Sequence, residues 1–316
     1  MPVDDRVVTV SVVIPAYNAA VFIGRTLDTV RAQTFTEYET ILVDDGSTDG
    51  TADVARAYWL RHGLRGQVIR QENRGIAAAR NTGMRAAAGT YIALLDHDDL
   101  WYPEKLATVM SEFRRHPGVD LICHEERITR DGEVVRVTRR QLPGGNLYEA
   151  LLFDGNLLSP SATTFSREVA LALGGFDERA EYLTVEDYDF WMRFSRERQF
   201  GFLDRVLGEY VLVERGASRR LVFHHLALEH MLRHHLNQYL RVHPGVLARL
   251  RVRRRLAMVY RSAARQLIQY GEHAADQRAF VGRMLRTYPI ELRNIAVALL
   301  WAAGAARRLS VHPARA

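Results

Sequence analysis

The sequence predicts an α/β protein built on a doubly wound, mostly parallel sheet with helices on both faces, followed by a mainly helical C-terminal region. Short aliphatic runs alternate with helical periods in the first half, and each run ends in turn-forming polar residues. The formal charge then changes sign along the chain. Residues 1–218 contain 25 basic and 33 acidic side chains, a charge of −8, whereas residues 219–316 contain 18 and 4, a charge of +14. We therefore expect two domains, at 1–218 and 219–316.

Three strands are predicted in the first hundred residues, at 9–15, 39–44 and 91–95. Helical periods separate them: one apolar face contains Ile23, Leu27 and Val30, another surrounds residues 54–58, and a helix of small residues follows Gly75 at 77–88. Because the carboxyl ends of parallel strands meet at one edge of a sheet, a ligand is expected at that edge.

The third strand leads directly into Asp96-His97-Asp98-Asp99. Like charges this close repel, and aspartates at i and i+2 can present hard oxygens to Mg²⁺ or Mn²⁺ while leaving positions for phosphates. His97 would point to the opposite side of an extended segment, so it is not counted as a ligand. Capping of a helix that begins near Pro103 is the alternative role for one of the aspartates. The predicted ligand is a metal-bound diphosphate.

Composition is compatible with a folded enzyme. A chain of 316 residues with 47% hydrophobic content can bury a sizeable core. Cys123 is the only cysteine, which excludes an intramolecular disulfide and a cysteine-based zinc cage and fits a reducing compartment. Residues 1–6 lack the charged, apolar and small-residue succession of a secretory signal, so we expect a cytoplasmic protein.

The order of these motifs resembles the family 2 glycosyltransferases, which have the GT-A fold, over roughly residues 8–215. The matching segments are VVIPAYN at 12–18, VDDGSTD at 43–49, NRG at 73–75 with ARN at 79–81, the Asp96 cluster, GGFD at 174–177 and EDYDFW at 186–191. The resemblance implies a metal-dependent, inverting transfer of a sugar from a nucleotide-diphosphate sugar, with a UDP-sugar as first choice. The implied acceptor is a hydroxyl of a glycan or a lipid-linked molecule in cell-surface polysaccharide or glycolipid synthesis.

Two other functions stay open beside this one. A sugar nucleotidyltransferase could use a similar sheet and a metal-bound phosphate, although no glycine- and lysine-rich pyrophosphate loop lies near the first strand. A non-catalytic carbohydrate-binding protein of the same fold is the third possibility, and the intact acidic motifs argue against it.

The resemblance places the donor nucleotide at the first two strand ends, with Pro15 beside it. Tyr17 would offer an aromatic face to the base, or else pack in the core. Asp45 can accept a base N–H, and Asp44 can fix the turn or the ribose. Arg80 would meet the diphosphate, unless it is a solvated surface residue.

The resemblance makes Asp98 the main metal ligand, with Asp96 contacting the ribose, the metal or a metal-bound water. The ion, Mn²⁺ or Mg²⁺, would neutralise the leaving nucleoside diphosphate. The family often adds a later histidine, but segment 210–216 contains none, and His224 is the possible substitute.

An acceptor hydroxyl must lose its proton, and Asp187 matches the general base of the family. Glu186 is a neighbouring acceptor-side candidate whose side chain points elsewhere on a helix. Gly175 would turn the chain toward the acceptor, and Trp191 would line that site or pack beneath it. The alternative is an acidic first turn favoured by the helix dipole.

The basic tail predicts an acidic partner without identifying it. Its histidine cluster at 224–235 is better explained as a solvated helix than as a metal site. The apolar run 295–306 has 12 residues, fewer than the roughly 20 that span a bilayer. It could lie in a membrane surface, pack on the first domain or pair subunits, and its basic flanks favour the first. We expect no nucleic-acid partner. An anionic surface at the cytoplasmic face of the membrane and a homo-oligomer formed through this region are both candidate associations.

Overall fold

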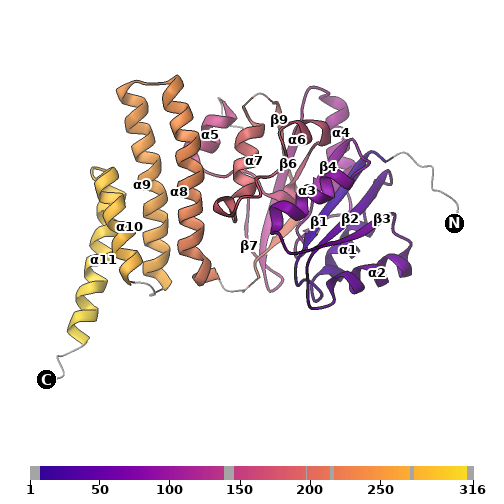
Figure 1. Cartoon of the computed structure of the whole chain (residues 1–316), viewed down its shortest axis with the longest axis horizontal. Coiled ribbons are helices and arrows are strands. Elements are labelled where there is room, and N and C mark those ends of the chain that lie inside the picture. Colours follow the sequence, from indigo (N-terminus) through magenta and orange to yellow (C-terminus); the bar gives the residue numbers. More distant parts are fainter. Residues whose placement is uncertain (1–7, 139–145, 197, 214–216, 271–273, 312–316) are drawn as a thin grey trace. The chain divides into compact units, whose positions relative to one another are not determined.

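The computed structural model describes residues 8–138, 146–196, 198–213, 217–270 and 274–311 (Figure 1). Its strands form one sheet in the order β3-β2-β1-β4-β8-β6-β9-β5, with β7 paired to β6. Strand β1 pairs in parallel with β2 and β4, and β2 pairs in parallel with β3. Strands β6 and β9 run in this same direction, whereas β5, β7 and β8 run in the opposite one. The strands in chain order are β1 (Val10–Ala16), β2 (Tyr38–Asp45), β3 (Gly66–Gln71), β4 (Tyr91–Leu94), β5 (Leu100–Trp101), β6 (Leu121–Arg130), β7 (Glu133–Val137), β8 (Thr163–Ser166) and β9 (Phe200–Val211).

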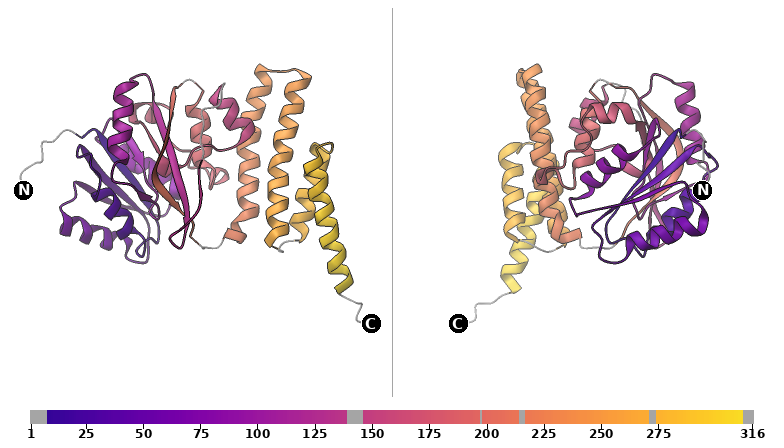
Figure 2. Two further views of the ribbon diagram at one scale, coloured as in Figure 1. Left: turned by 180° about the vertical axis from the view of Figure 1, so that it is seen from behind. Right: turned by 45° about the vertical axis from the view of Figure 1, so that its right-hand side comes forward.

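The mostly parallel sheet and its helices confirm the predicted fold class, and the views in Figure 2 show helices on both faces of the sheet. The helices that accompany the sheet are α1 (Ile23–Arg31), α2 (Thr51–His62), α3 (Ile76–Ala86), α4 (Lys105–Arg115), α5 (Leu147–Asp154), α6 (Arg167–Ala172) and α7 (Glu186–Phe194), with 3₁₀ turns η1 (Pro160–Ala162) and η2 (Ala180–Tyr182).

Successive side chains of β1 point to opposite faces of the sheet, so the strand packs against helices on both faces. Val12 and Ile14 are buried in one hydrophobic cluster with residues of α1 and α4. Val13 points to the opposite face, where a Cβ built on Gly83 of α3 would lie only 2.4 Å from its Cγ1. The small residues of α3 therefore let this helix approach the sheet closely, as the sequence predicts.

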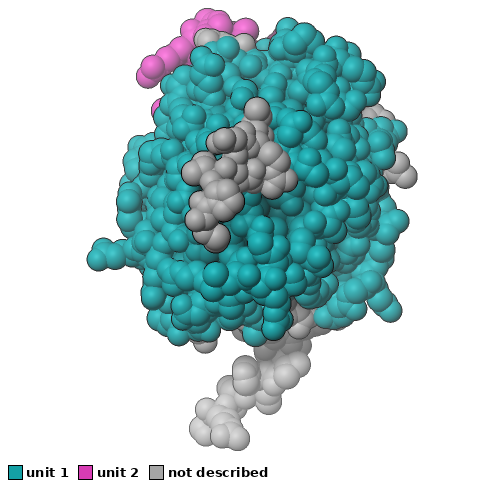
Figure 3. All heavy atoms as spheres, turned by 90° about the vertical axis from the view of Figure 1, so that its right-hand side faces the viewer, with its two compact units in different colours: residues 1–151, 155–213 teal, residues 152–154, 214–316 magenta. Residues whose placement is uncertain are grey.

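The chain divides into two compact units, which Figure 3 distinguishes by colour. Unit 1 contains residues 1–151 and 155–213, and unit 2 contains residues 152–154 and 214–316. The boundary predicted after residue 218 stays a prediction, and this position falls inside helix α8 (Ala217–Val242).

Unit 2 is mainly helical. After α8 it contains α9 (Val246–Tyr270), α10 (Ala274–Thr287) and α11 (Leu292–Val311). Helix α9 contacts the other three, and its buried Tyr260 lies near Phe280 of α10. In the part of the chain that the structure describes, no helix combines the length and apolar character needed to cross a membrane.

Candidate active site

The three polar motifs predicted at strand ends meet at one edge of the sheet, because β1 lies between β2 and β4. His97 Nδ1, after β4, lies 3.2 Å from the Pro15 carbonyl oxygen at the end of β1. The β1 and β2 ends are joined through Asn18, whose side-chain oxygen accepts the Thr48 N–H at 3.0 Å. His97 thus contacts the backbone of β1.

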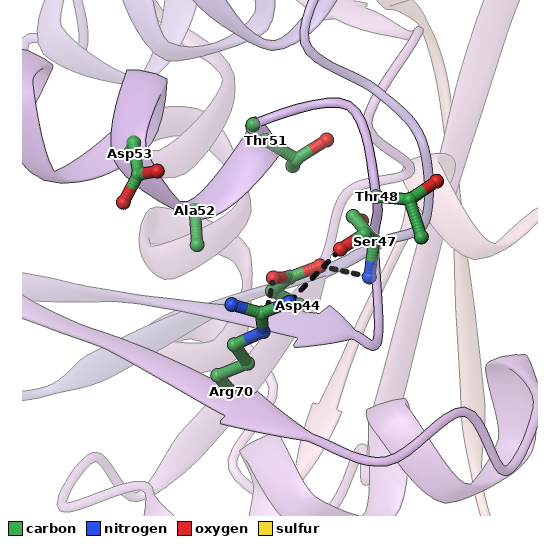
Figure 4. A pocket seen from close by; sticks show the side chains of 8 residues that line it. Asp44, Ser47, Thr48, Thr51, Ala52, Asp53 and Arg70 are labelled. Atoms are coloured by element: carbon green, nitrogen blue, oxygen red, sulfur yellow. Dashed lines mark hydrogen bonds and ion pairs between the residues drawn. The ribbon is translucent and has the colours of Figure 1, made fainter.

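Asp44 lines an open hollow of about 370 Å³ next to β2 (Figure 4). Its carboxylate is 1% exposed; one oxygen accepts the Ser47 N–H at 3.0 Å, and the other lies 3.5 Å from Arg70 Nε. Arg70 also donates to the Ser47 carbonyl at 3.0 Å. Residues Asp44, Ser47, Thr48, Gly50, Thr51, Ala52, Asp53 and Arg70 line the hollow. The hollow offers hydroxyls and the exposed Arg70 guanidinium to a polar ligand, while the buried Asp44 holds Ser47 and Arg70 in place.

Asp45 holds the loop between β3 and α3. Its oxygens accept hydrogen bonds from Gln71 Nε2 at 2.8 Å, the Arg74 N–H at 3.0 Å and the Gly75 N–H at 2.8 Å. Gly46, with φ of +78°, lets this loop pass, since a Cβ there would lie 2.8 Å from the Asn73 nitrogen. In this structure, the oxygens predicted to accept a base N–H bind the loop.

Tyr17 follows β1 and is 48% exposed, so its ring is accessible to a ligand. Pro15 is buried within β1. Core packing, the alternative role for Tyr17, does not account for a side chain exposed to this degree.

Arg80 joins two parts of the site. Its Nη1 donates to Glu186 Oε1 at 2.9 Å, and its Nη2 donates to Asp96 Oδ1 and Oδ2 at 2.9 and 3.2 Å. The guanidinium is 2% exposed and lies 5.4 Å from the ring centroid of Phe176. Burial lowers the pKa of Arg80, but the charges of Asp96 and Glu186 outweigh it and raise the pKa overall. Arg80 is thus a buried ion-pair residue, and its contact with a diphosphate stays a prediction.

Asp99, the last residue of the Asp96 cluster, is held by two hydrogen bonds. Its carboxylate is buried and accepts hydrogen bonds from Ser161 Oγ and from the Val211 N–H. Burial raises the pKa of Asp99, and the neighbouring charges of Asp96 and Glu126 raise it further. In the first turn of α4, the N-cap residue Glu104 makes no side-chain cap and the Leu106 N–H donates to Gln33 Oε1 at 3.0 Å, so Gln33 has the role that the capping alternative gave to Asp99.

The residues at the β4 end fit a divalent cation shared with phosphates. Asp98 is half-buried, and Asp96 is 20% exposed although it pairs with Arg80. Negative charge concentrates here: burial, followed by Asp99, Asp96 and Asp98, raises the pKa of Tyr210 in β9. Over the described ranges, no three His, Cys, Asp or Glu side chains form a ready-made metal cluster. One or two carboxylates suffice when substrate phosphates supply the other oxygens.

A further metal ligand was expected from segment 210–216 or from His224. Residues 214–216 of the segment searched for a histidine lie outside the described residues. His224 belongs to α8 of unit 2.

Asp187 and Glu186 begin α7 with different surroundings. Asp187 is half-buried; Oδ1 accepts the Tyr188 N–H at 2.7 Å, and Oδ2 accepts Asn156 Nδ2 at 3.3 Å. Burial raises the pKa of Asp187, while Arg80 opposes the rise. Burial also raises the pKa of Glu186 to about 7, against the lowering effect of Arg80 and with an added rise from Asp187. The two side chains differ in their partners, as the helical spacing predicts.

Gly175 and Trp191 are packing residues near the start of α7. Gly175 has φ of +72°, and a Cβ there would lie 2.4 Å from Asn81 Oδ1. Asn81 exchanges two hydrogen bonds of 2.8 Å with the Phe176 backbone. Trp191 is fully buried and packs edge to face on Phe165 and Phe176. Of the two roles considered for Trp191, packing beneath the site is the one that this structure contains.

The sequence did not indicate three residues that hold the candidate aspartates in position: Arg70, Asn156 and Ser161. Ser161 contacts both the Asp96 N–H, which donates to its Oγ at 3.0 Å, and the Asp99 carboxylate. A serine between two segments carries no distinguishing signal. Asn81 belongs to the ARN segment at 79–81, so the sequence indicates this residue but not its contact with the Phe176 backbone.

Comparison with known proteins identifies similar sequences. The family model described as glycosyl transferase family 2 matches residues 11–172. The amylovoran biosynthesis glycosyltransferase AmsB of Erwinia amylovora is 32% identical over 222 residues, covering 67% of this chain and 72% of AmsB. The chondroitin synthase of Escherichia coli is 30% identical over 210 residues, covering 66% of this chain. The chain spans only 29% of that synthase and 62% of each of two uncharacterised glycosyltransferases from Rickettsia prowazekii and Rickettsia typhi.

Solved structures share the fold at low sequence identity. The mannosyltransferase PcManGT from Pyrobaculum calidifontis, in complex with GDP-Man and Mn²⁺, superposes with a TM-score of 0.58 at 20% identity, covering 96% of this chain and 88% of that one. Residues 1–349 of S. aureus TarS, in complex with UDP-GlcNAc, give a TM-score of 0.55 at 17% identity, with 89% of each chain covered. The predicted GT-A fold is confirmed.

Proposed function

The chain belongs to glycosyl transferase family 2, and from this we propose that it moves a sugar from a nucleoside-diphosphate sugar to a hydroxyl of a glycan or lipid-linked acceptor, with inversion at the anomeric carbon. A UDP-sugar is our first choice of donor. The product would belong to a cell-surface polysaccharide or glycolipid, and the work would take place at the cytoplasmic face of the membrane.

The names of the relatives support this substrate class. AmsB is an amylovoran biosynthesis enzyme, and the chondroitin synthase and the hyaluronan synthase of Pasteurella multocida make polysaccharides. The two solved structures were obtained with UDP-GlcNAc and with GDP-Man, both nucleoside-diphosphate sugars. Family membership favours glycosyl transfer over a nucleotidyltransferase and over a non-catalytic binding protein.

In the proposed reaction, the acceptor oxygen bonds to the anomeric carbon as the bond from that carbon to the phosphate oxygen breaks. The acceptor hydroxyl proton passes to Asp187, and the electron pair of the broken bond leaves with the nucleoside diphosphate. A carboxylate whose pKa is raised is a stronger base than an ordinary one, and burial raises the pKa of Asp187. The Tyr188 N–H and Asn156 orient its two oxygens.

On the donor side, the exposed Tyr17 would stack on the base, and the hollow lined by Asp44 would accept polar groups of the nucleotide. Asp98, with Asp96 beside it, would hold Mn²⁺ or Mg²⁺. When bound, such an ion supplies positive charge that stabilises the leaving diphosphate.

The observation that carries the proposal is the double ion pair of Arg80. One buried guanidinium binds Asp96 at the strand end and Glu186 next to Asp187. Asp187 directly follows Glu186, so this contact supports a single site in which the metal-binding candidate Asp96 and the base candidate Asp187 serve two bound substrates.

The test is Asp187→Asn. We expect nucleotide affinity close to that of the unmodified protein and an initial transfer rate lower by about 10²-fold or more, since binding and proton removal are separate demands. Nucleotide affinity by calorimetry and nucleotide release with a panel of donors and Mn²⁺ would be measured side by side. An unchanged transfer rate would exclude Asp187 as the base.

A further inference from the structure

Helix α11 has an apolar outer face that no described part of unit 2 covers. Its inner face is anchored: Asn294 is fully buried and bonds to Arg261 and the Tyr288 carbonyl, and Val297 is 5% exposed. The outer face, called here the α11 face, consists of Leu292, Ile295, Ala296, Leu299, Leu300 and Ala303, all exposed. Leu299 and Leu300 are 66% and 61% exposed. A contiguous exposed apolar patch rimmed by polar residues marks a protein or membrane interaction site.

The views of unit 2 show why this face is open. Helix α11 lies at the outer edge of the row of helices, and its last turns extend past the ends of α8, α9 and α10 (Figures 1 and 2). It contacts α9 and α10 through its other side.

The turn that precedes α11 adds apolar and basic groups at the same end of the helix. Ile290 is 74% exposed and Leu292 is 81% exposed. Arg253 of α9 donates to the Thr287 carbonyl at 2.8 Å, and Arg254 lies 3.8 Å from Glu291. Since Arg261 already pairs with Glu291 at 2.9 Å, positive charge exceeds negative charge around this turn.

Charge decides between the two occupants that an apolar helix face can accept. A second copy would bring two regions of formal charge +14 together, and their repulsion opposes that contact. An anionic lipid surface instead complements the arginines while its acyl boundary accepts the leucines.

We propose that α11 and the preceding turn dock unit 2 on an anionic bilayer, with the α11 face lying in the plane of the interface and the neighbouring arginines at the headgroups. The leucines supply apolar burial, and Arg286 and Arg293, both exposed, supply attraction that salt screens beyond roughly 8–10 Å. The inference does not depend on the proposed transfer reaction, because binding to lipid requires neither donor nor acceptor.

The experiment is co-sedimentation of the full chain with vesicles of phosphatidylcholine alone and with vesicles that also contain phosphatidylglycerol. We expect binding to the anionic vesicles to exceed binding to the neutral ones by about tenfold at low salt, and to weaken as salt is added. The variant Leu299→Ser with Leu300→Ser should lower the partition coefficient about tenfold or more at every salt concentration. The variant Arg286→Gln with Arg293→Gln should lower it about tenfold at low salt only.

A matched control lies on α2 of unit 1, where Leu60 is 87% exposed and Arg61 is exposed as well. The variant Leu60→Ser with Arg61→Gln should bind vesicles as the unmodified chain does. Circular dichroism of every variant checks that the helices are retained.

Three results would each overturn the proposal. The first is vesicle binding that persists in the Leu299 and Leu300 variant. The second is an equal loss in the α2 control. The third is a dimer in solution, detected by light scattering, that the leucine variant dissociates while neither protein binds vesicles.

Discussion

One buried charged residue near the candidate site, Lys105, has specific partners. Lys105 is fully buried, donates to Thr164 Oγ1 at 3.0 Å and lies 3.6 Å from the Trp101 ring centroid. Burial lowers the pKa of Lys105, whereas Glu126 opposes the fall.

At this scale, the first prediction concerns Asp98→Asn. The change removes the charge of the proposed metal ligand at nearly constant shape, so metal-dependent turnover should fall by about 100-fold or more with little loss of folding. Initial rates across a Mn²⁺ titration, beside thermal unfolding, measure both effects. The exposed Glu168 of α6 provides the control, since Glu168→Gln removes one negative charge away from the loop. Near-normal activity of Asp98→Asn at limiting Mn²⁺ would reject the assignment.

A second residue-scale prediction concerns the pH dependence of transfer. The proposed mechanism requires ionised Asp187, so the rate should fall as pH drops through the raised pKa of this residue. The Asn156 side chain donates to Asp187 and thereby lowers its pKa. Removing that donor in Asn156→Ala should raise the pKa, and the acidic limb of kcat/KM should move to higher pH, by about one unit or less.

The measurement is kcat/KM against pH for both proteins, with donor saturation verified at each pH. A limb that moves to lower pH, or that stays in place, contradicts the proposed role of Asp187.

The sequence indicated the candidate metal ligand and the candidate base better than the residues that position them. Asp98 and Asp187 stand in segments whose order resembles a family, so their importance is visible without a structure. The partners of Asp45 are not, because its contacts with Arg74 and Gly75 depend on how the loop before α3 folds back on β2. The same holds for Ser161, which reaches two aspartates about sixty residues away in sequence.

At the scale of elements, alanine substitutions at the two adjacent glycines before Phe176 can distinguish the cost of backbone strain from the cost of a steric clash. Gly174 and Gly175 both have positive φ, +81° and +72°, but a Cβ on Gly174 meets nothing within 4 Å, whereas one on Gly175 meets Asn81. Gly174→Ala should therefore cost about 1 kcal/mol of unfolding free energy, the strain alone. Gly175→Ala should cost about 2 kcal/mol more, because the contact between Asn81 and Phe176 must give way.

Denaturant unfolding of the two variants checks the difference. Equal losses at the two positions would mean that the Asn81 contact adds nothing to the strain.

The strands that the sequence predicted are those buried on both faces. β1, β2 and β4 have continuous aliphatic runs, and their ends were located to within one residue. β6 was not predicted, because its centre contains His124, Glu125 and Glu126, which read as a surface segment. Thr138 Oγ1 donates to the buried Glu125 and Ser159 Oγ donates to the buried Glu126, and a sequence does not show such distant partners.

At the scale of the whole molecule, the formal charge differs between two parts of the sequence: it is −8 for residues 1–218 and +14 for residues 219–316. Like charges within a compact unit repel, and dissolved salt screens that repulsion. We therefore predict that amide hydrogen exchange in α8–α11 slows as NaCl rises from about 20 mM to about 200 mM, while exchange in β1, β2 and β4 changes less.

Peptide-resolved exchange at constant pH measures both units in one sample. Protection in α9 that is insensitive to salt, or that decreases with it, would show that self-repulsion does not limit the stability of the helical unit.

The Arg80 bridge also constrains how such a molecule can diversify. Since one guanidinium is bonded to Asp96 and to Glu186, an exchange of either carboxylate leaves a buried cation with half of its partners. A substitution of Glu186 at the start of α7 is therefore coupled to Asp96 after β4 through Arg80. Consider a chimera that takes the α7 segment from one protein and the α3 and β4 segments from another. It should fold only when Arg80, Asp96 and Glu186 are all retained together.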